Sequence, residues 1–133
     1  MKKLYFFLLV LIIFGGCVKK KQEEKVLDAM TNGQWKVTIF TKGSTDLTAN
    51  FDPYKFQFKS NNTVDAINNG TVEKTGSWDE DMAARTITSN FTNTGNPLLL
   101  LNGTWKIINN SWTWVEAQQT LNNELMTLRL DKQ

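Results

Sequence analysis

The segment Asn32-Gly33-Gln34-Trp35-Lys36-Val37 returns in similar form as Asn102-Gly103-Thr104-Trp105-Lys106-Ile107, and a third Gly-x-Trp stands at Gly76-Ser77-Trp78. Around these motifs apolar and polar side chains alternate, which predicts strands with one buried face. A glycine two residues before a tryptophan lets the backbone turn sharply into the strand. The tryptophan then supplies a large apolar plug. We predict that these motifs close one end of a small barrel and leave a mouth at the other. The alternative is internal duplication, although the rest of the repeats do not align. The barrel-closing residues are Gly33, Trp35, Trp78 and Trp105.

Eight strands are predicted, and turn signals such as Asn69-Gly70, which is typical of hairpins, separate many of them. The predicted strands are residues 35–39, 54–58, 63–67, 71–78, 85–91, 103–108, 111–117 and 123–130. Before them, residues 23–32 predict a short helix with an apolar face and Gly33 as its C-cap. The fold class is therefore all-β: an eight-stranded antiparallel up-and-down barrel with a short N-terminal helix, or else a sandwich.

The N-terminus has the pattern of a secretory leader. Lys2 and Lys3 precede an unbroken apolar run of eleven residues, Leu4–Phe14, which is too short to span a bilayer. The segment Phe14-Gly15-Gly16-Cys17 resembles the lipobox of bacterial lipoproteins. This resemblance implies cleavage before Cys17 and acylation of its thiol, which would anchor the protein in the outer membrane.

The domain boundaries follow from this reading. Residues 1–16 are the lipoprotein signal peptide, residues 17–24 are the lipidated cysteine with a polar tether, and residues 25–133 are the barrel domain. The charges after Cys17 resemble the surface-export signal of Bacteroidetes lipoproteins, with a merely soluble linker as the alternative. The sequence therefore leaves the periplasmic face and the cell surface as alternatives for the anchored protein.

Composition argues against several functions. Removing the leader leaves 13 basic and 13 acidic residues, which favours neither nucleic acid nor an anionic surface as partner. The chain has no histidine, and Cys17 is its only cysteine, so Ser/His and Cys/His nucleophile pairs are excluded. The carboxylates Asp79–Asp81 are expected to form a solvated turn rather than an acid/base pair or a calcium site. We expect no enzyme, no cofactor and no metal site.

The layout from Leu27 to Leu130 resembles the lipocalin-like lipoproteins of Bacteroidetes, which have a calycin-type barrel. The matching stretches are Gly33–Val37, Tyr54–Phe58, Gly76–Trp78, Trp105–Ile107 and Leu125–Leu130. In lipocalins a late arginine lies across the first-strand tryptophan, and the resemblance gives this role to Arg129 over Trp35. Because Met126, Leu128 and Leu130 alternate with Arg129, a solvated outer position is the alternative.

Two functions remain open from the sequence. The resemblance implies a barrel that binds a small hydrophobic ligand, and the alternative is a filled barrel that binds an envelope protein or another macromolecule through its surface. The candidate ligand-lining residues are Phe56, Phe58, Trp112 and Trp114, although aromatic residues in strands are usually core. The run Leu98–Leu101 is either a buried plug or an apolar lid.

Overall fold

The computed structural model describes residues 25–133 as a short helix followed by a β-barrel. The helix spans residues 25–31, and β2 is a short strand that pairs only with β1. The elements after the helix are β1 (Trp35–Lys42), β2 (Thr45–Asp46), η1 (Thr48–Phe51), β3 (Tyr54–Phe58), β4 (Thr63–Asn68), β5 (Thr71–Asp81), β6 (Thr86–Asn90), η2 (Leu98–Leu101), β7 (Gly103–Asn110), β8 (Trp114–Leu121) and β9 (Glu124–Lys132).

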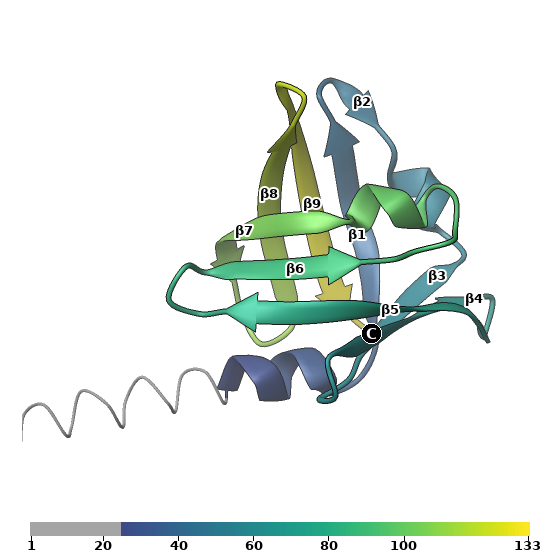
Figure 1. Ribbon diagram of the computed structural model, residues 1–133, viewed down its shortest axis with the longest axis vertical. Helices are drawn as coiled ribbons and strands as arrows, with labels where there is room; N and C mark the ends of the chain where they lie inside the picture. Colours follow the sequence, from purple (N-terminus) through teal and green to yellow (C-terminus); the bar gives the residue numbers. More distant parts are fainter. Residues whose placement is uncertain (1–24) are drawn as a thin grey trace, which may run out of the picture.

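The eight longer strands form a closed antiparallel barrel, as the sequence predicts. Each pairs with its neighbour along the chain, and β1 pairs with β9 to close the ring. In Figure 1 the helix lies across one end of this barrel, beside the lower ends of β8 and β9. The predicted signal peptide and tether lie outside the described residues. Among residues 25–133, no helix combines the length and apolarity needed to cross a membrane.

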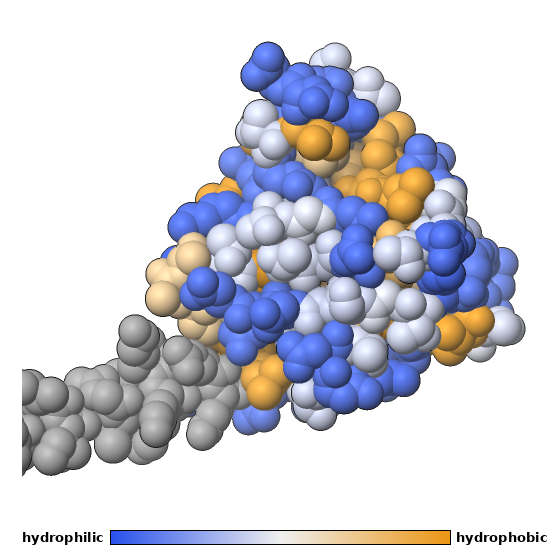
Figure 2. Space-filling model, viewed as in Figure 1, coloured by the Kyte–Doolittle hydropathy of each residue, from blue (hydrophilic) through white to orange (hydrophobic). Residues whose placement is uncertain are grey.

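Side chains that alternate along each strand point inward and fill the barrel. On β9, Met126, Leu128 and Leu130 are buried, and on β3, Tyr54, Phe56 and Phe58 are buried. By contrast, the face over β5, β6 and β7 is mainly hydrophilic or neutral (Figure 2). The short helix contributes to the core as well: Met30 is 1% exposed, and Val26 and Leu27 pack against the core. Among residues 25–133, the core residues lie between residues 26 and 130.

The three Gly-x-Trp motifs do not act together at one end, so this prediction was wrong. The Trp35 indole donates to the Met30 carbonyl at 3.0 Å, beside the helix. The Trp105 indole instead donates to the Leu101 carbonyl at 2.9 Å and packs edge-on against Phe40 at 5.9 Å. Phe40 is five positions beyond Trp35 on β1, which is about 16 Å along a strand. Trp35 and Trp105 therefore close opposite halves of the interior.

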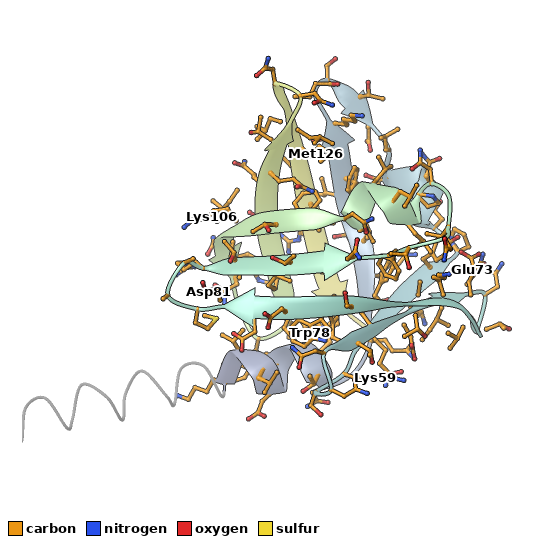
Figure 3. The ribbon with its side chains drawn as sticks, viewed as in Figure 1. Lys59, Glu73, Trp78, Asp81, Lys106 and Met126 are labelled. Carbon is orange, nitrogen blue, oxygen red and sulfur yellow. The ribbon has the colours of Figure 1, made fainter. Side chains whose placement is uncertain are left out.

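The glycines of these motifs also differ in their physical role. Gly33 and Gly103 have φ values of +83° and +112°, and at such angles glycine is strongly favoured. Gly76 instead lies within β5, where an added Cβ would approach the Asn90 carbonyl oxygen to 2.6 Å. Trp78 is thus not at a strand start; it lies near Lys59, whose carbonyl it contacts at 2.9 Å, well away from Met126 (Figure 3). The glycine therefore permits a turn in two of the motifs and the close packing of neighbouring strands in the third.

Two loop predictions change in detail. The acidic run Asp79–Asp81 is the end of β5 rather than a turn, because its residues pair with Thr86–Thr88 of β6. Asp81 lies next to the turn in Figure 3 and accepts a hydrogen bond from the Ala84 amide at 3.1 Å. The run Leu98–Leu101 forms the 3₁₀ turn η2, in which Leu98 and Leu101 are buried. Of the two readings for this run, the structure supports the plug.

Candidate functional site

A cleft of about 410 Å³ lies between the N-terminal helix and the end of the barrel. The helix forms one wall, and the β5–β6 and β7–β8 turns form the others. The floor consists of inward-facing strand residues. The lining residues are Lys25, Val26, Ala29, Met30, Trp35, Met82, Arg85, Ile87, Ile107, Asn110, Ser111, Trp112 and Val115. Concave, mostly apolar sites of this size with a few polar groups are typical ligand sites.

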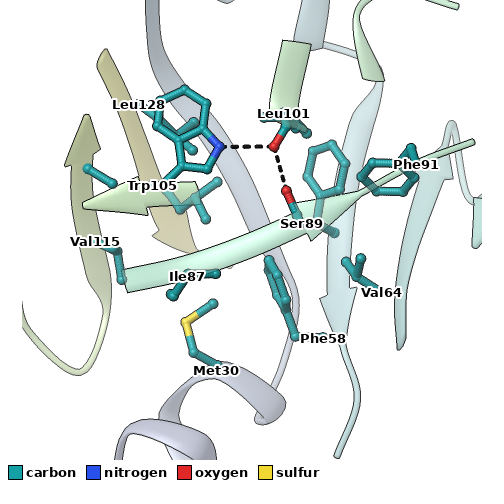
Figure 4. Close-up of a pocket in the computed structure, with 13 residues that line it drawn as sticks. Met30, Phe58, Val64, Ile87, Ser89, Phe91, Leu101, Trp105, Val115 and Leu128 are labelled. Carbon is teal, nitrogen blue, oxygen red and sulfur yellow. Dashed lines mark hydrogen bonds between the residues drawn. The ribbon is translucent and has the colours of Figure 1, made fainter. Parts of the chain in front are cut away.

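A second, much smaller cavity of about 40 Å³ lies inside the barrel. Its lining is almost wholly apolar and includes Phe56, Phe58 and Trp105. Two polar side chains at its wall form hydrogen bonds to the same backbone oxygen: Trp105 Nε1 and Ser89 Oγ both donate to the Leu101 carbonyl (Figure 4). Because few polar atoms line the cavity and their donors already bond to protein, its lining suits apolar matter. It has room for a few atoms, and the barrel interior is otherwise filled.

Met30, Ile87 and Val115 line both the cleft and the cavity, and they form a septum between them. All three are at least nine-tenths buried. In Figure 4, Met30 reaches from the helix toward Ile87, on the opposite side of the cavity from Leu101 and Trp105. The bond from the Trp35 indole to the Met30 carbonyl fixes this end of the helix and satisfies a carbonyl at a helix end. The flexible side chain of Met30 thus closes the barrel interior at this end.

The structure separates the four candidate ligand-lining residues. Phe56 and Phe58 line the inner cavity, and Trp112 lines the cleft with 57% of its surface exposed. Trp114, contrary to expectation, lines neither space. It points out of the barrel because it precedes the inward-facing Val115, and neighbouring strand residues face opposite sides.

Arg129 does not lie over Trp35; the structure supports the alternative, an outward position on β9. Its guanidinium lies over the Trp114 ring at 4.8 Å and bonds to Asp131 at 2.9 Å and Glu116 at 2.8 Å. The hydrogen bonding of Arg129 to Asp131 lowers the pKa of the Asp131 carboxyl, and the hydrogen bond from Thr38 acts in the same direction. The alternation of β9 explains the outward direction, since Leu128 and Leu130 face the core.

Lys132 takes the place over Trp35 that the resemblance gives to Arg129. Its ammonium lies 5.1 Å from the indole centre, and the two residues are paired across β9 and β1. Lys132 has the same strand parity as Leu128 and Leu130, so it reaches the barrel end from the inner side. A cation over a tryptophan face contributes about 0.5–2 kcal/mol. Parity explains the inward direction of Lys132, although the predicted last strand ended two residues earlier, at Leu130.

Two cations stand at the rim of the cleft. Arg85 is in the β5–β6 turn with φ +55°, and its Nη2 donates to Asn110 Oδ1 at 3.3 Å across the cleft end of the sheet. Lys25 is exposed on the first turn of the helix. Sequence reasoning missed both, along with Met82, because no motif marks them and their proximity depends on barrel closure. Within residues 25–133 no group of three acidic, histidine or cysteine residues is placed to hold a metal ion.

Comparison with known proteins supports the fold. No protein-family model matches the chain, and no curated protein matches it significantly. The structure is similar to the crystal structure of a DUF4847 family protein from Bacteroides vulgatus, with a TM-score of 0.57 and 15% identity. The match covers 81% of this chain and 99% of the other. At this identity the similarity shows a shared barrel fold and carries no function across.

Proposed function

We propose that this protein is a lipid-anchored, lipocalin-like barrel that binds a small hydrophobic ligand, and that its role is binding rather than catalysis. The cleft beside the helix carries the proposal. Its floor is apolar and buried, its volume is about 410 Å³, and it exposes the large aromatic face of Trp112. The inner cavity, at about 40 Å³, is too small to hold such a ligand alone. The proposed ligand site is therefore at the barrel end, not at its centre.

The anchor places this cleft near a bilayer. Cys17 is the proposed lipidation site, and the first residue of the cleft is Lys25, eight positions later. A fully extended segment of that length spans about 28 Å at most. The cleft would then lie within one tether length of the outer membrane, where apolar ligands concentrate.

The matched tryptophans provide the test. The probe is N-phenyl-1-naphthylamine, whose fluorescence rises in apolar surroundings, titrated into the chain from residue 17 onward carrying Cys17→Ser. We expect saturable binding that weakens about tenfold in Trp112→Ala, because a stacked aromatic contact and its buried area are lost. Trp114→Ala is the control, since Trp114 lies outside both spaces. Equal loss in the two variants, or no saturable binding, contradicts the proposed site.

The nearly filled interior favours a second candidate function, a lipoprotein that binds a macromolecule through its surface. Native mass spectrometry of the protein purified from its own host separates the two. A reproducible extra mass lost on organic extraction supports the carrier. A bare protein mass, together with a partner recovered by crosslinking through Trp112, supports the surface role.

A further inference from the structure

We propose that the cleft selects an amphiphile with a carboxylate head, which Arg85 and Lys25 bind at the rim while the apolar tail lies against the septum. This inference rests on the proposed function and adds the charge of the ligand. Three features of the described residues support it: the sign of the lining charges, the backbone conformation of Arg85 and the gradient of burial.

The charges of the cleft have one sign. Lys25 and Arg85 are its charged lining residues, and no carboxylate is among them. The chain from Cys17 onward has equal numbers of acidic and basic residues, so this excess is local. The ion pairs within residues 25–133 involve Lys59 and Arg129 as cations, not the two rim cations. An anionic group at the rim would balance the two positive charges.

The backbone conformation of Arg85 is unusual for a residue with a long side chain. Six non-glycine residues among those described have positive φ, and five of them are asparagine. Asparagine is well suited to the left-handed region, whereas a long side chain there is disfavoured. Arg85, at φ +55°, is the exception. Disfavoured backbone positions of this kind cluster at ligand sites, where the surrounding structure holds them.

The neighbours of Arg85 hold it facing the cleft. Its amide donates to the Met82 carbonyl at 3.3 Å, and its carbonyl accepts from the Ile107 amide at 2.9 Å. The bond to Asn110 uses one of the five guanidinium N–H donors. A planar guanidinium matches a carboxylate, which can accept two parallel hydrogen bonds. The nearby Asp81 lines no part of the cleft and bonds to the turn backbone instead.

Burial fixes the orientation of the ligand. The rim cations are exposed, whereas Met30, Ile87 and Val115 at the floor are buried. An amphiphile would therefore enter tail first, with its head remaining at the surface. The septum separates its tail from the inner cavity of about 40 Å³.

The test uses two competitors with the same tail. Dodecanoate and dodecanol each displace N-phenyl-1-naphthylamine at pH 8 from the Cys17→Ser chain that begins at residue 17. We expect Arg85→Asn to weaken dodecanoate about five- to tenfold relative to dodecanol, as for loss of a charge-assisted hydrogen bond. Lys25→Gln should act in the same direction, and Arg85→Lys should retain most of the preference. Lys55→Gln is the control for general charge, because the Lys55 side chain is exposed on the outer face of β3.

The same variant reports on folding. Asparagine is favoured at this backbone position, so Arg85→Asn should raise the melting temperature while it weakens the carboxylate, which separates binding from misfolding. An unchanged ratio of dodecanoate to dodecanol in both Arg85→Asn and Lys25→Gln overturns this inference alone. Failure of the naphthylamine probe to bind overturns the proposed function as well. Uptake of phosphatidylglycerol from vesicles without displacement by dodecanoate overturns the carboxylate head, because a lipid with a phosphate head would then occupy the cleft.

Discussion

Replacing Met30 by alanine should weaken the fold and strengthen ligand binding at the same time. Met30 is 1% exposed and separates the cleft from the inner cavity. Methionine-to-alanine changes in cores cost about 2–5 kcal/mol. We expect about 2–3 kcal/mol here, because the vacated space joins the open cleft and does not remain a sealed void. For a domain of this size that loss lowers the melting temperature by roughly 10 °C.

Binding should change in the opposite direction. Without the septum side chain, a ligand tail can reach the space beyond Ile87 and Val115. Each additional CH₂ group that becomes buried contributes about 0.8 kcal/mol, or roughly fourfold in affinity. Met30→Ala should therefore bind N-phenyl-1-naphthylamine or dodecanoate about three- to tenfold more tightly than the parent chain.

The assay needs two measurements on each variant. Urea unfolding followed by tryptophan fluorescence gives the free energy of unfolding, and probe titration gives the affinity. Leu27→Ala is the matched control, because Leu27 lies on the same helix and packs on the core but borders neither space. The control should lose stability without gaining affinity. If Met30→Ala loses less than about 0.5 kcal/mol, or binds the probe no better, the septum argument is refuted.

Three further predictions concern other parts of the molecule. The hydrogen bond and ion pair from Lys59 at 2.8 Å lower the pKa of Asp65, so the carboxylate stabilises the fold above its unfolded pKa near 4. Asp65→Asn should therefore destabilise at pH 7 and lose its effect as the pH falls below that value; an equal effect at pH 3 and pH 7 in urea unfolding would contradict this. Gly76→Ala should cost about 2–3 kcal/mol in the same assay, because its Cβ would lie 2.6 Å from the Asn90 carbonyl oxygen and the neighbouring strand must move; unchanged stability would show that β5 and β6 separate freely. Cys17→Ser should abolish incorporation of an alkynyl palmitate analogue in the host, and retained label would place the acyl group elsewhere.

The predictions that held were those that depend on local pattern. Alternation on β3 and β9 gives the inward faces directly, because side chains one residue apart point to opposite sides of a sheet. The helix with Met30 on its apolar face was equally readable. The same alternation directs Arg129 outward and Lys132 inward. The position over Trp35 was assigned to Arg129 from the family resemblance, in conflict with this alternation.

The predictions that failed required knowledge of spatial position. Trp35 and Trp105 lie in opposite halves of the barrel although both belong to a Gly-x-Trp motif. The height at which a strand begins along the barrel depends on its register with the paired strands. Trp112 and Trp114 are two residues apart, yet one lies in the turn and one in β8, and only the second follows the strand's alternation. Their separation into cleft and outer face is a property of the β7–β8 turn.

By itself, the sequence determined eight antiparallel strands with a short helix before them, whereas a barrel was preferred to a sandwich on the family resemblance and is shown by the pairing of β1 with β9. Periodicity of two, turn residues and a short amphipathic segment act over a few neighbours, so they can be read without coordinates. Only the tertiary structure decided that the interior is almost full, that Met30 forms a septum, and that Lys25 and Arg85 meet at the same rim. These features join residues from the helix, the β5–β6 turn and the β7–β8 turn, and they exist because pairing of β1 with β9 closes the barrel and the helix then packs across its end.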